Sequence, residues 1–145
     1  MLLEHAAEFH THLGPFLVLG LRAGLAALRV LSTRHGDPEL SVEVDLPYRV
    51  PMSCLLDGIQ FSTGCTAGNK RLTFRDSTEI VATFRRRDTM VRITVTEKTR
   101  KLLLPLFLGE RLDERELHKL AHGLADLDEK SLLITNQIPG SQTRG

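Results

Sequence analysis

The sequence predicts an α+β fold, in which helices pack on an antiparallel sheet within a single domain. The chain has 145 residues, a length that suits one domain with one hydrophobic core. Apolar residues recur at helical spacing near both ends of the chain and alternate with polar residues in its middle. The resulting order of helix, strand, helix, several strands and two helices lacks the regular alternation of a doubly wound parallel sheet.

Two helices are expected at the N-terminus. Residues 4–12 can form a short helix that ends before the Gly14-Pro15 pair, because proline disfavours a helical conformation in the residue before it. A second helix is expected over 16–32, where leucines and valines lie at helical spacing. Gly20 and Gly24 lie four residues apart in this helix, and they predict a small-residue face against which a neighbouring backbone packs closely.

The middle of the chain is expected to form most of the sheet. Leu40, Val42 and Val44 alternate with polar residues, which is typical of a half-buried strand. Residues 54–61 have apolar positions at helical spacing and predict a short helix. Further strands are predicted over 72–75, 80–86 and 90–96.

The C-terminal part is expected to be mainly helical. Helices are predicted over 98–108 and 113–126, the second with Asp113 as its N-cap and Glu116 three residues on. A last strand over 132–138 completes a domain of residues 1–138. Residues 139–145, which include glycine, serine and threonine, are expected to be a flexible tail.

The composition excludes several classes of function. The 19 basic and 18 acidic residues leave a formal net charge of +1, so the chain has no overall field that would attract nucleic acid or an anionic membrane. The first residues do not resemble a secretory signal, and the longest apolar stretch is interrupted by glycine and arginine. Two cysteines are too few for a disulfide scaffold, which favours a cytoplasmic location.

Two histidines and two cysteines form the main candidate site. His10, His12, Cys54 and Cys65 supply the imidazole and thiolate groups that zinc or another divalent transition metal prefers. Their spacing matches no zinc-finger template. The alternative interpretation is that the cysteines pack as small hydrophobic residues and the histidines lie at a helix end.

Cysteine chemistry is the competing interpretation. Cys65 lies in a glycine-containing loop, and a nearby His10 or His12 would activate it as a nucleophile in a thiol-dependent enzyme. A redox pair of Cys54 and Cys65 is a further alternative, although the two lack the spacing of thioredoxin-like sites. The residues alone leave these alternatives open.

Three motifs resemble the FmdE family of formylmethanofuran dehydrogenase components. They are Phe9-His10-Thr11-His12-Leu13-Gly14-Pro15 with the following glycine-containing helix, Asp57-Gly58-Ile59-Gln60, and Thr63-Gly64-Cys65-Thr66. Gly14 stands where many members of the family have cysteine, and Asn69-Lys70-Arg71 stands where the family tends to have Lys-Gly-Asn. The resemblance implies an α+β domain, often with a bound zinc ion, that self-associates, here as a homodimer.

The resemblance also suggests roles for individual residues. With cysteine absent at position 14, His12, Cys54 and Cys65 would leave one metal position open for water or a small substrate, and His10 is a further candidate ligand. Gln60 and Thr63 would hold that substrate, Asp57 or Gln60 would hydrogen-bond a ligating imidazole, and Arg22 would pair with an anionic group. A non-enzymatic, metal-stabilised interaction module is the alternative function.

Overall fold

The computed structural model describes residues 2–139 and confirms the α+β class, with one five-stranded sheet in the order β2-β1-β3-β4-β5. The strands are β1 (Leu40–Leu46), β2 (Leu72–Asp76), β3 (Val81–Arg86), β4 (Thr89–Val95) and β5 (Leu133–Pro139). The helices are α1 (Leu2–His10), α2 (Pro15–Val30), α3 (Leu55–Thr63), α4 (Glu97–Phe107), α5 (Glu114–Asp126) and α6 (Glu129–Leu132), with a 3-10 turn η1 (Met52–Cys54) before α3. Of the predicted tail at 139–145, all but Pro139 lies outside the described residues.

One strand pairing corrects the expectation of a purely antiparallel sheet. Strands β1 and β2 run parallel, with Val42 opposite Leu72, whereas the other three pairings are antiparallel. The connection between β1 and β2 contains η1 and α3. A helical crossover of this kind returns the chain in its original direction, so the sheet is mixed. The alternating pattern predicted the strand but carried no information about its direction.

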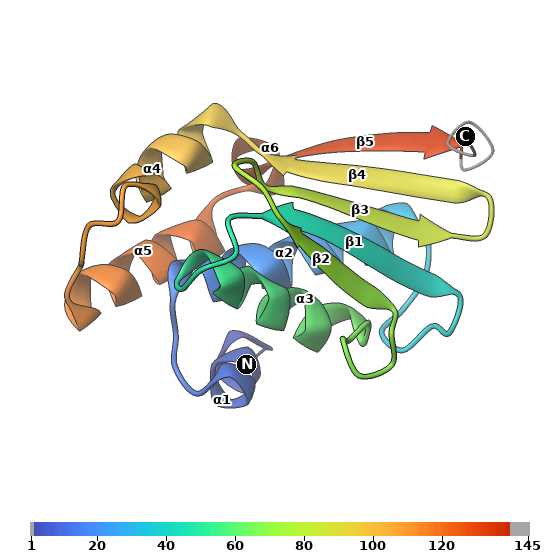
Figure 1. Cartoon of the computed structure of the whole chain (residues 1–145), viewed down its shortest axis with the longest axis horizontal. Coiled ribbons are helices and arrows are strands. Elements are labelled where there is room, and N and C mark those ends of the chain that lie inside the picture. The colour runs from blue at the N-terminus through green and yellow to red at the C-terminus, as the bar shows by residue number, and fades with distance from the viewer. Residues whose placement is uncertain (1, 140–145) are drawn as a thin grey trace.

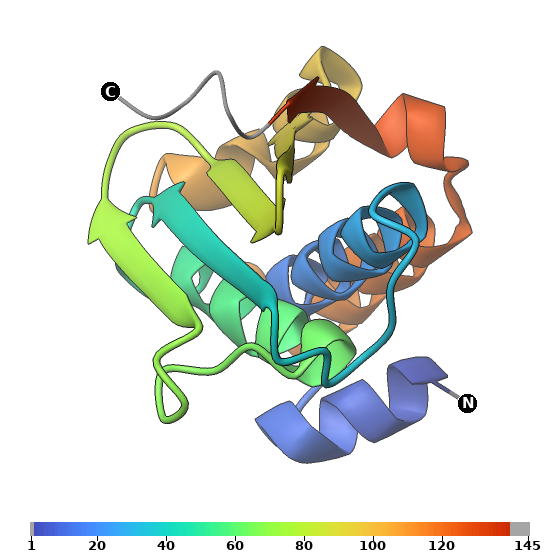
Figure 2. The same cartoon turned by 90° about the vertical axis from the view of Figure 1, so that its right-hand side faces the viewer.

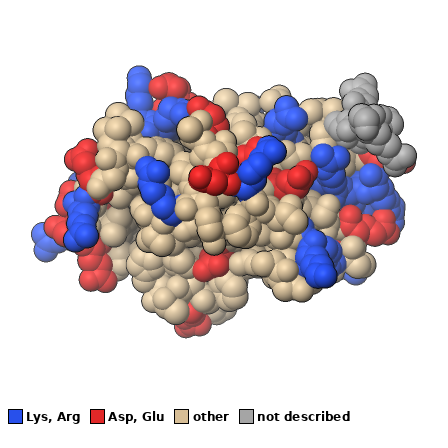
Figure 3. Space-filling model, viewed as in Figure 1, with Lys and Arg blue, Asp and Glu red and all other residues tan. Residues whose placement is uncertain are grey.

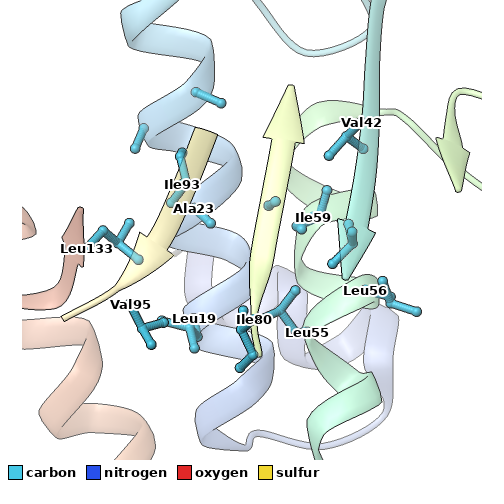
Figure 4. Packing of buried hydrophobic residues seen from close by; sticks show 14 of the residues in the cluster. Leu19, Ala23, Val42, Leu55, Leu56, Ile59, Ile80, Ile93, Val95 and Leu133 are labelled. Carbon is cyan, nitrogen blue, oxygen red and sulfur yellow. The ribbon is translucent and has the colours of Figure 1, made fainter. Parts of the chain in front are cut away.

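The core lies between the sheet and the two central helices. Alternation in β1 turns Leu40, Val42, Val44 and Leu46 toward the helices, and all four are fully or almost fully buried. Figure 1 shows α2 and α3 lying across one face of the sheet, with α1 outside them. Side chains from α2, α3 and the strands meet in this layer (Figure 4).

Helices α2 and α3 approach each other through glycines. A Cβ placed on Gly20 would lie 2.0 Å from the carbonyl oxygen of Leu55, and one placed on Gly24 would lie 1.9 Å from Oγ of Ser62. Gly58 of α3 faces α2 in the same way. The sequence therefore correctly predicted a small-residue face on α2, and the structure shows that the neighbouring backbone belongs to α3.

The C-terminal helices follow their predicted caps. Asp113 accepts a hydrogen bond from the backbone N–H of Glu116, whose side chain accepts one from the backbone N–H of Asp113, forming the expected capping box. Ala121 and Leu124 of α5 are buried in the core cluster, and α5 packs on α2. The sequence pattern did not predict α6, which spans only four residues.

Asp37 ties the start of β1 to its surroundings. Its carboxylate accepts hydrogen bonds from Oγ1 of Thr33 and Nε of Arg86, both at 2.5 Å, and from the backbone N–H of Glu39 at 2.9 Å. These donors favour the ionised form and hold the pKa of Asp37 well below its usual range. The carboxylate thus links the α2–β1 connection to β3.

Stability should consequently depend on the ionisation of Asp37. Because its folded-state pKa is lowered, its contribution is complete above the unfolded-state value of about 3.9 and is lost as the pH falls below that value. We expect Asp37→Asn to lower stability at pH 7 and to flatten the decline between about pH 5 and pH 2. Urea unfolding across this range measures the effect, with Asp88→Asn as the control in the exposed β3–β4 turn. An unchanged pH profile in Asp37→Asn would contradict the assignment.

Charges of both signs cover the outer surface. Figure 3 shows Lys and Arg side chains intermixed with Asp and Glu rather than gathered into a patch of one sign. Several of them pair across strands, as Arg75 does with Asp45 at 2.9 Å. None of the helices described between residues 2 and 139 has the length and apolarity needed to cross a membrane.

Candidate functional site

A histidine–carboxylate pair joins the end of α1 to the start of α3. Nδ1 of His10 lies 2.5 Å from Oδ2 of Asp57, and the His10 side chain is only 11% exposed. Because a carboxylate only accepts hydrogen bonds, Nδ1 carries the proton. In the neutral ring, Nε2 is then left as an acceptor or metal ligand, which is the arrangement that carboxylates impose on metal-binding histidines.

His12 lies beside this pair. Its ring centroid is 4.9 Å from that of His10, and the two planes are inclined by 39°. Thr11 has a positive φ of 83°, so the chain turns sharply between the two histidines and brings their rings together. A Cβ placed on Gly14 would lie 3.6 Å from Nε2 of His12. His12 is exposed, so its imidazole is accessible from solvent.

The two cysteines lie at opposite ends of α3. Cys54 immediately precedes the helix, and its pKa is raised by burial and by the nearby Asp57 carboxylate. Cys65 follows the helix, is 1% exposed and donates from Sγ to the carbonyl oxygen of Leu40 at 3.3 Å. Nine helical residues separate the ends of α3 by about 13 Å. The structure does not bring Cys65 to the histidines.

The surroundings of Cys65 also disfavour a role as nucleophile. Burial raises the pKa of its thiol, whereas reactive cysteines are accessible and have a lowered pKa. Neither His10 nor His12 lies at the end of α3 that carries Cys65. A redox pair with Cys54 would require the two thiols to meet across the length of the helix. Cys65 instead packs as a small hydrophobic residue, the alternative that the sequence left open.

Zinc ligation by all four predicted residues does not fit this arrangement. Across residues 2–139, no three His, Cys, Asp or Glu side chains come together as metal ligands do. What the structure provides is two adjacent imidazoles, one of them oriented by Asp57, with Cys54 on the same end of α3. A closed, four-ligand structural zinc site is therefore absent from the described residues.

Gln60 and Thr63 take different positions from the substrate site that the sequence predicted. Nε2 of Gln60 donates to Oδ1 of Asp57 at 3.2 Å, while its Oε1 accepts from the backbone N–H of Ala67 at 3.0 Å. Gln60 thus links the histidine–carboxylate pair to the glycine-containing loop. Thr63 is fully buried and donates to the carbonyl oxygen of Ile59, so it holds the end of α3 and does not face a substrate.

Arg22 stabilises a helix end. Its NH1 donates to the carbonyl oxygens of Leu124 and Leu127, and a longer contact of 3.4 Å reaches Ala125. These carbonyls lie at the C-terminal end of α5, where a positive charge is favourable. The structure gives the guanidinium these partners in place of the anionic substrate group that the sequence suggested.

Removing Arg22 should lower stability. Hydrogen bonds from a charged donor contribute about 1.5–3 kcal/mol, so we expect Arg22→Met to cost about 2 kcal/mol. The matched control is Arg29→Met on the same helix, because Arg29 is 61% exposed and pairs with Glu129 at the surface. That control should cost less than about 1 kcal/mol in the same urea titration. Equal losses in the two variants would contradict the role assigned to Arg22.

One polar side chain near α3 was not predicted from the sequence. His35 lies in a turn cluster before β1, and its Nδ1 is 3.1 Å from the carbonyl oxygen of Ser62. The 27 residues between them carry no spacing signal, because the contact depends on how the α2–β1 connection packs against the end of α3. Only the turn residues around His35 indicated that its backbone was free to approach another element.

The fold and the paired imidazoles define a small α+β domain with a histidine–carboxylate site between its first and third helices. Comparison with known families shows which one it is: the model described as "FmdE, Molybdenum formylmethanofuran dehydrogenase operon" matches residues 9–132, and the chain belongs to this family. The family resemblance seen in the sequence is thereby confirmed.

Two individual proteins are similar to the chain. A probable S-adenosyl-L-methionine-binding protein of Archaeoglobus fulgidus is 42% identical over 76 residues, which are 52% of this chain and 20% of that protein. The chain thus matches about a fifth of the length of this relative. An FmdE-like protein of tungsten formylmethanofuran dehydrogenase from Syntrophus aciditrophicus superposes with a TM-score of 0.62 at 19% identity, covering 94% of this chain and 70% of that one. The superposition shows a shared fold.

Proposed function

We propose that the chain binds a divalent transition-metal ion, with zinc as the first candidate, through the imidazoles of His10 and His12. The observation that carries the proposal is the 2.5 Å contact between Nδ1 of His10 and Asp57, which leaves Nε2 available beside the ring of His12. Imidazole nitrogen is a preferred ligand for zinc, copper and nickel. Cys54 is the candidate third donor, because it lies with Asp57 at the same end of α3.

This is an open site. Two or three protein ligands leave positions for water or for an atom of a small ligand, where an ion acts as a Lewis acid when bound. The openness favours a ligand-binding role over a purely structural role as a metal-stabilised interaction module. The residues of the chain contribute orientation, because Asp57 holds the ring of His10 and Gln60 holds Asp57.

Zinc titration of metal-free protein tests the proposal. Four-ligand zinc sites bind with roughly 10–16 kcal/mol, so two imidazoles should give a dissociation constant on the order of 10–100 μM. We expect His10→Ala and His12→Ala each to weaken binding at least about tenfold. Cys65→Ser and His122→Ala should leave it unchanged, and Cys54→Ser decides whether that thiol is a third donor. Equal affinities across the histidine variants would contradict the site.

We also propose that the chain forms a homodimer in the cytoplasm. Strand β2 is at one edge of the sheet, and its Phe74 is 41% exposed, stacked on Tyr48 at a centroid distance of 4.5 Å. An edge strand with an exposed aromatic pair suits pairing with a second copy. Both cysteines are free thiols, which suits a reducing compartment. Sedimentation equilibrium should show a dimer that Phe74→Lys dissociates, and a monomeric wild-type chain would refute it.

A further inference from the structure

A pocket of about 710 Å³ lies among α1, α2 and α3, next to the candidate site. Its apolar lining comprises Leu2, Phe9, Leu25, Leu28 and Phe61. Figure 2 shows α1 lying below α2 and α3, the helices between which this apolar pocket forms. Its volume falls in the range of sites that hold small molecules. Gln60 also lines the pocket and is hydrogen-bonded to Asp57, so the apolar pocket and the histidine pair are neighbours.

The walls of the apolar pocket favour an uncharged, flat ligand. Phe9 and Phe61 face each other with ring centroids 6.0 Å apart and planes inclined by 43°. Phe9 is 52% exposed and Leu25 is 38% exposed, so this apolar surface is accessible to a ligand. Among the described residues, none that lines the pocket is Asp, Glu, Lys or Arg. A ligand with a buried charge would find no counter-ion there.

The polar groups of the apolar pocket leave one strong acceptor without a partner. Both ends of the Gln60 amide are hydrogen-bonded, and Oγ of Ser62 donates to the carbonyl oxygen of Gly58. Nδ1 of His35 faces the carbonyl oxygen of Ser62, which only accepts, so Nδ1 carries the proton and Nε2 of the neutral ring is an acceptor. A Cβ placed on Gly64, another lining residue, would lie 3.3 Å from this Nε2.

We propose that the apolar pocket binds a neutral, planar heteroaromatic ring whose N–H donates to Nε2 of His35. The ring would stack against Phe9 and Phe61, and the N–H would satisfy the one acceptor left over. This inference goes beyond the proposed metal function. It requires no metal ion, so metal-free protein is the sample in which to test it.

Indole and 1-methylindole form a matched pair of probes, because both are neutral and flat and only indole has an N–H donor. Binding is followed by amide chemical shifts in metal-free protein at pH 8. We expect saturable shifts around the apolar pocket and an affinity about three- to tenfold higher for indole, the range of one neutral hydrogen bond. His35→Phe should reduce this ratio to about one while keeping a ring at that position.

Two leucine variants separate the apolar pocket from general surface binding. Leu25→Trp fills the pocket and should weaken both probes at least fivefold, an effect on the order of the packing it displaces. Leu102→Trp introduces the same side chain at a similarly exposed leucine of α4 and should change neither affinity.

Three results would overturn the proposal. The first is the absence of saturable shifts for indole up to its solubility limit. The second is an indole preference that survives in His35→Phe. The third is a wild-type dimer that Leu25→Trp dissociates in sedimentation experiments, because the occupant of the apolar pocket would then be a second copy of the chain.

Discussion

Replacing Gly58 with alanine is expected to destabilise the domain by about 3 kcal/mol, the upper end of what overpacking a core costs. The added Cβ would lie 2.3 Å from the carbonyl oxygen of Leu17 and 2.5 Å from the backbone nitrogen of Leu21. Both neighbours are main-chain atoms of α2, so no side-chain rotation relieves the contact. The two helices must separate, and the layer between them and the sheet must loosen.

Urea unfolding followed by circular dichroism measures this effect, and Gly123→Ala is its control. Gly123 lies inside α5, and a Cβ placed there meets nothing within 4 Å. Alanine at that position should raise stability by about 0.5–1 kcal/mol, because it has the higher helix propensity. A Gly58→Ala variant that unfolds within about 1 kcal/mol of the wild type would show that the helices are not held at this distance.

The second large effect is a gain of metal affinity in Gly14→Cys. Gly14 has φ −139° and ψ 164°, an extended conformation that any residue adopts. The atoms that a Cβ there would meet within 4 Å belong to the His12 ring. A thiolate at position 14 would therefore join the imidazoles as a further ligand. Since a four-ligand zinc site binds with roughly 10–16 kcal/mol, one more ligand should tighten binding on the order of 100-fold.

Competition with a chromophoric chelator measures the affinity of Gly14→Cys, with Gly14→Ser as the control of equal size. The serine hydroxyl is a poor zinc ligand, so its affinity should stay near that of the wild type. Combining Gly14→Cys with His12→Ala should remove most of the gain. An unchanged affinity in Gly14→Cys would mean that His10 and His12 do not form part of a metal site.

The strands, the long helices and their caps could be predicted from local patterns. Alternation identified β1 and β4, and the Asp113–Glu116 pair identified the start of α5, because these signals come from neighbouring residues in the chain. The parallel direction of β2 could not be predicted this way. It depends on where the crossover through α3 returns the chain, which is a property of the tertiary structure.

The candidate site shows the same division. Proximity of His10 and His12 follows from two residues of separation, and the family resemblance linked them to Asp57. The position of Cys65 could not be read from the sequence, because a buried thiol and a metal-bound thiolate are the same residue type in a similar loop. Arg22 likewise has ordinary helical surroundings in sequence, and its partners lie more than a hundred residues away.

The most direct test of the paired-imidazole site is long-range proton–nitrogen NMR of the histidine rings during zinc titration of metal-free protein. The structure predicts that Nε2 of His10 and a ring nitrogen of His12 shift together as zinc is added, while Nδ1 of His10 keeps its proton and its contact with Asp57. The rings of His118 and His122 should remain unchanged. Zinc-dependent shifts confined to those two histidines, or none at His10 and His12, would contradict the paired-imidazole site.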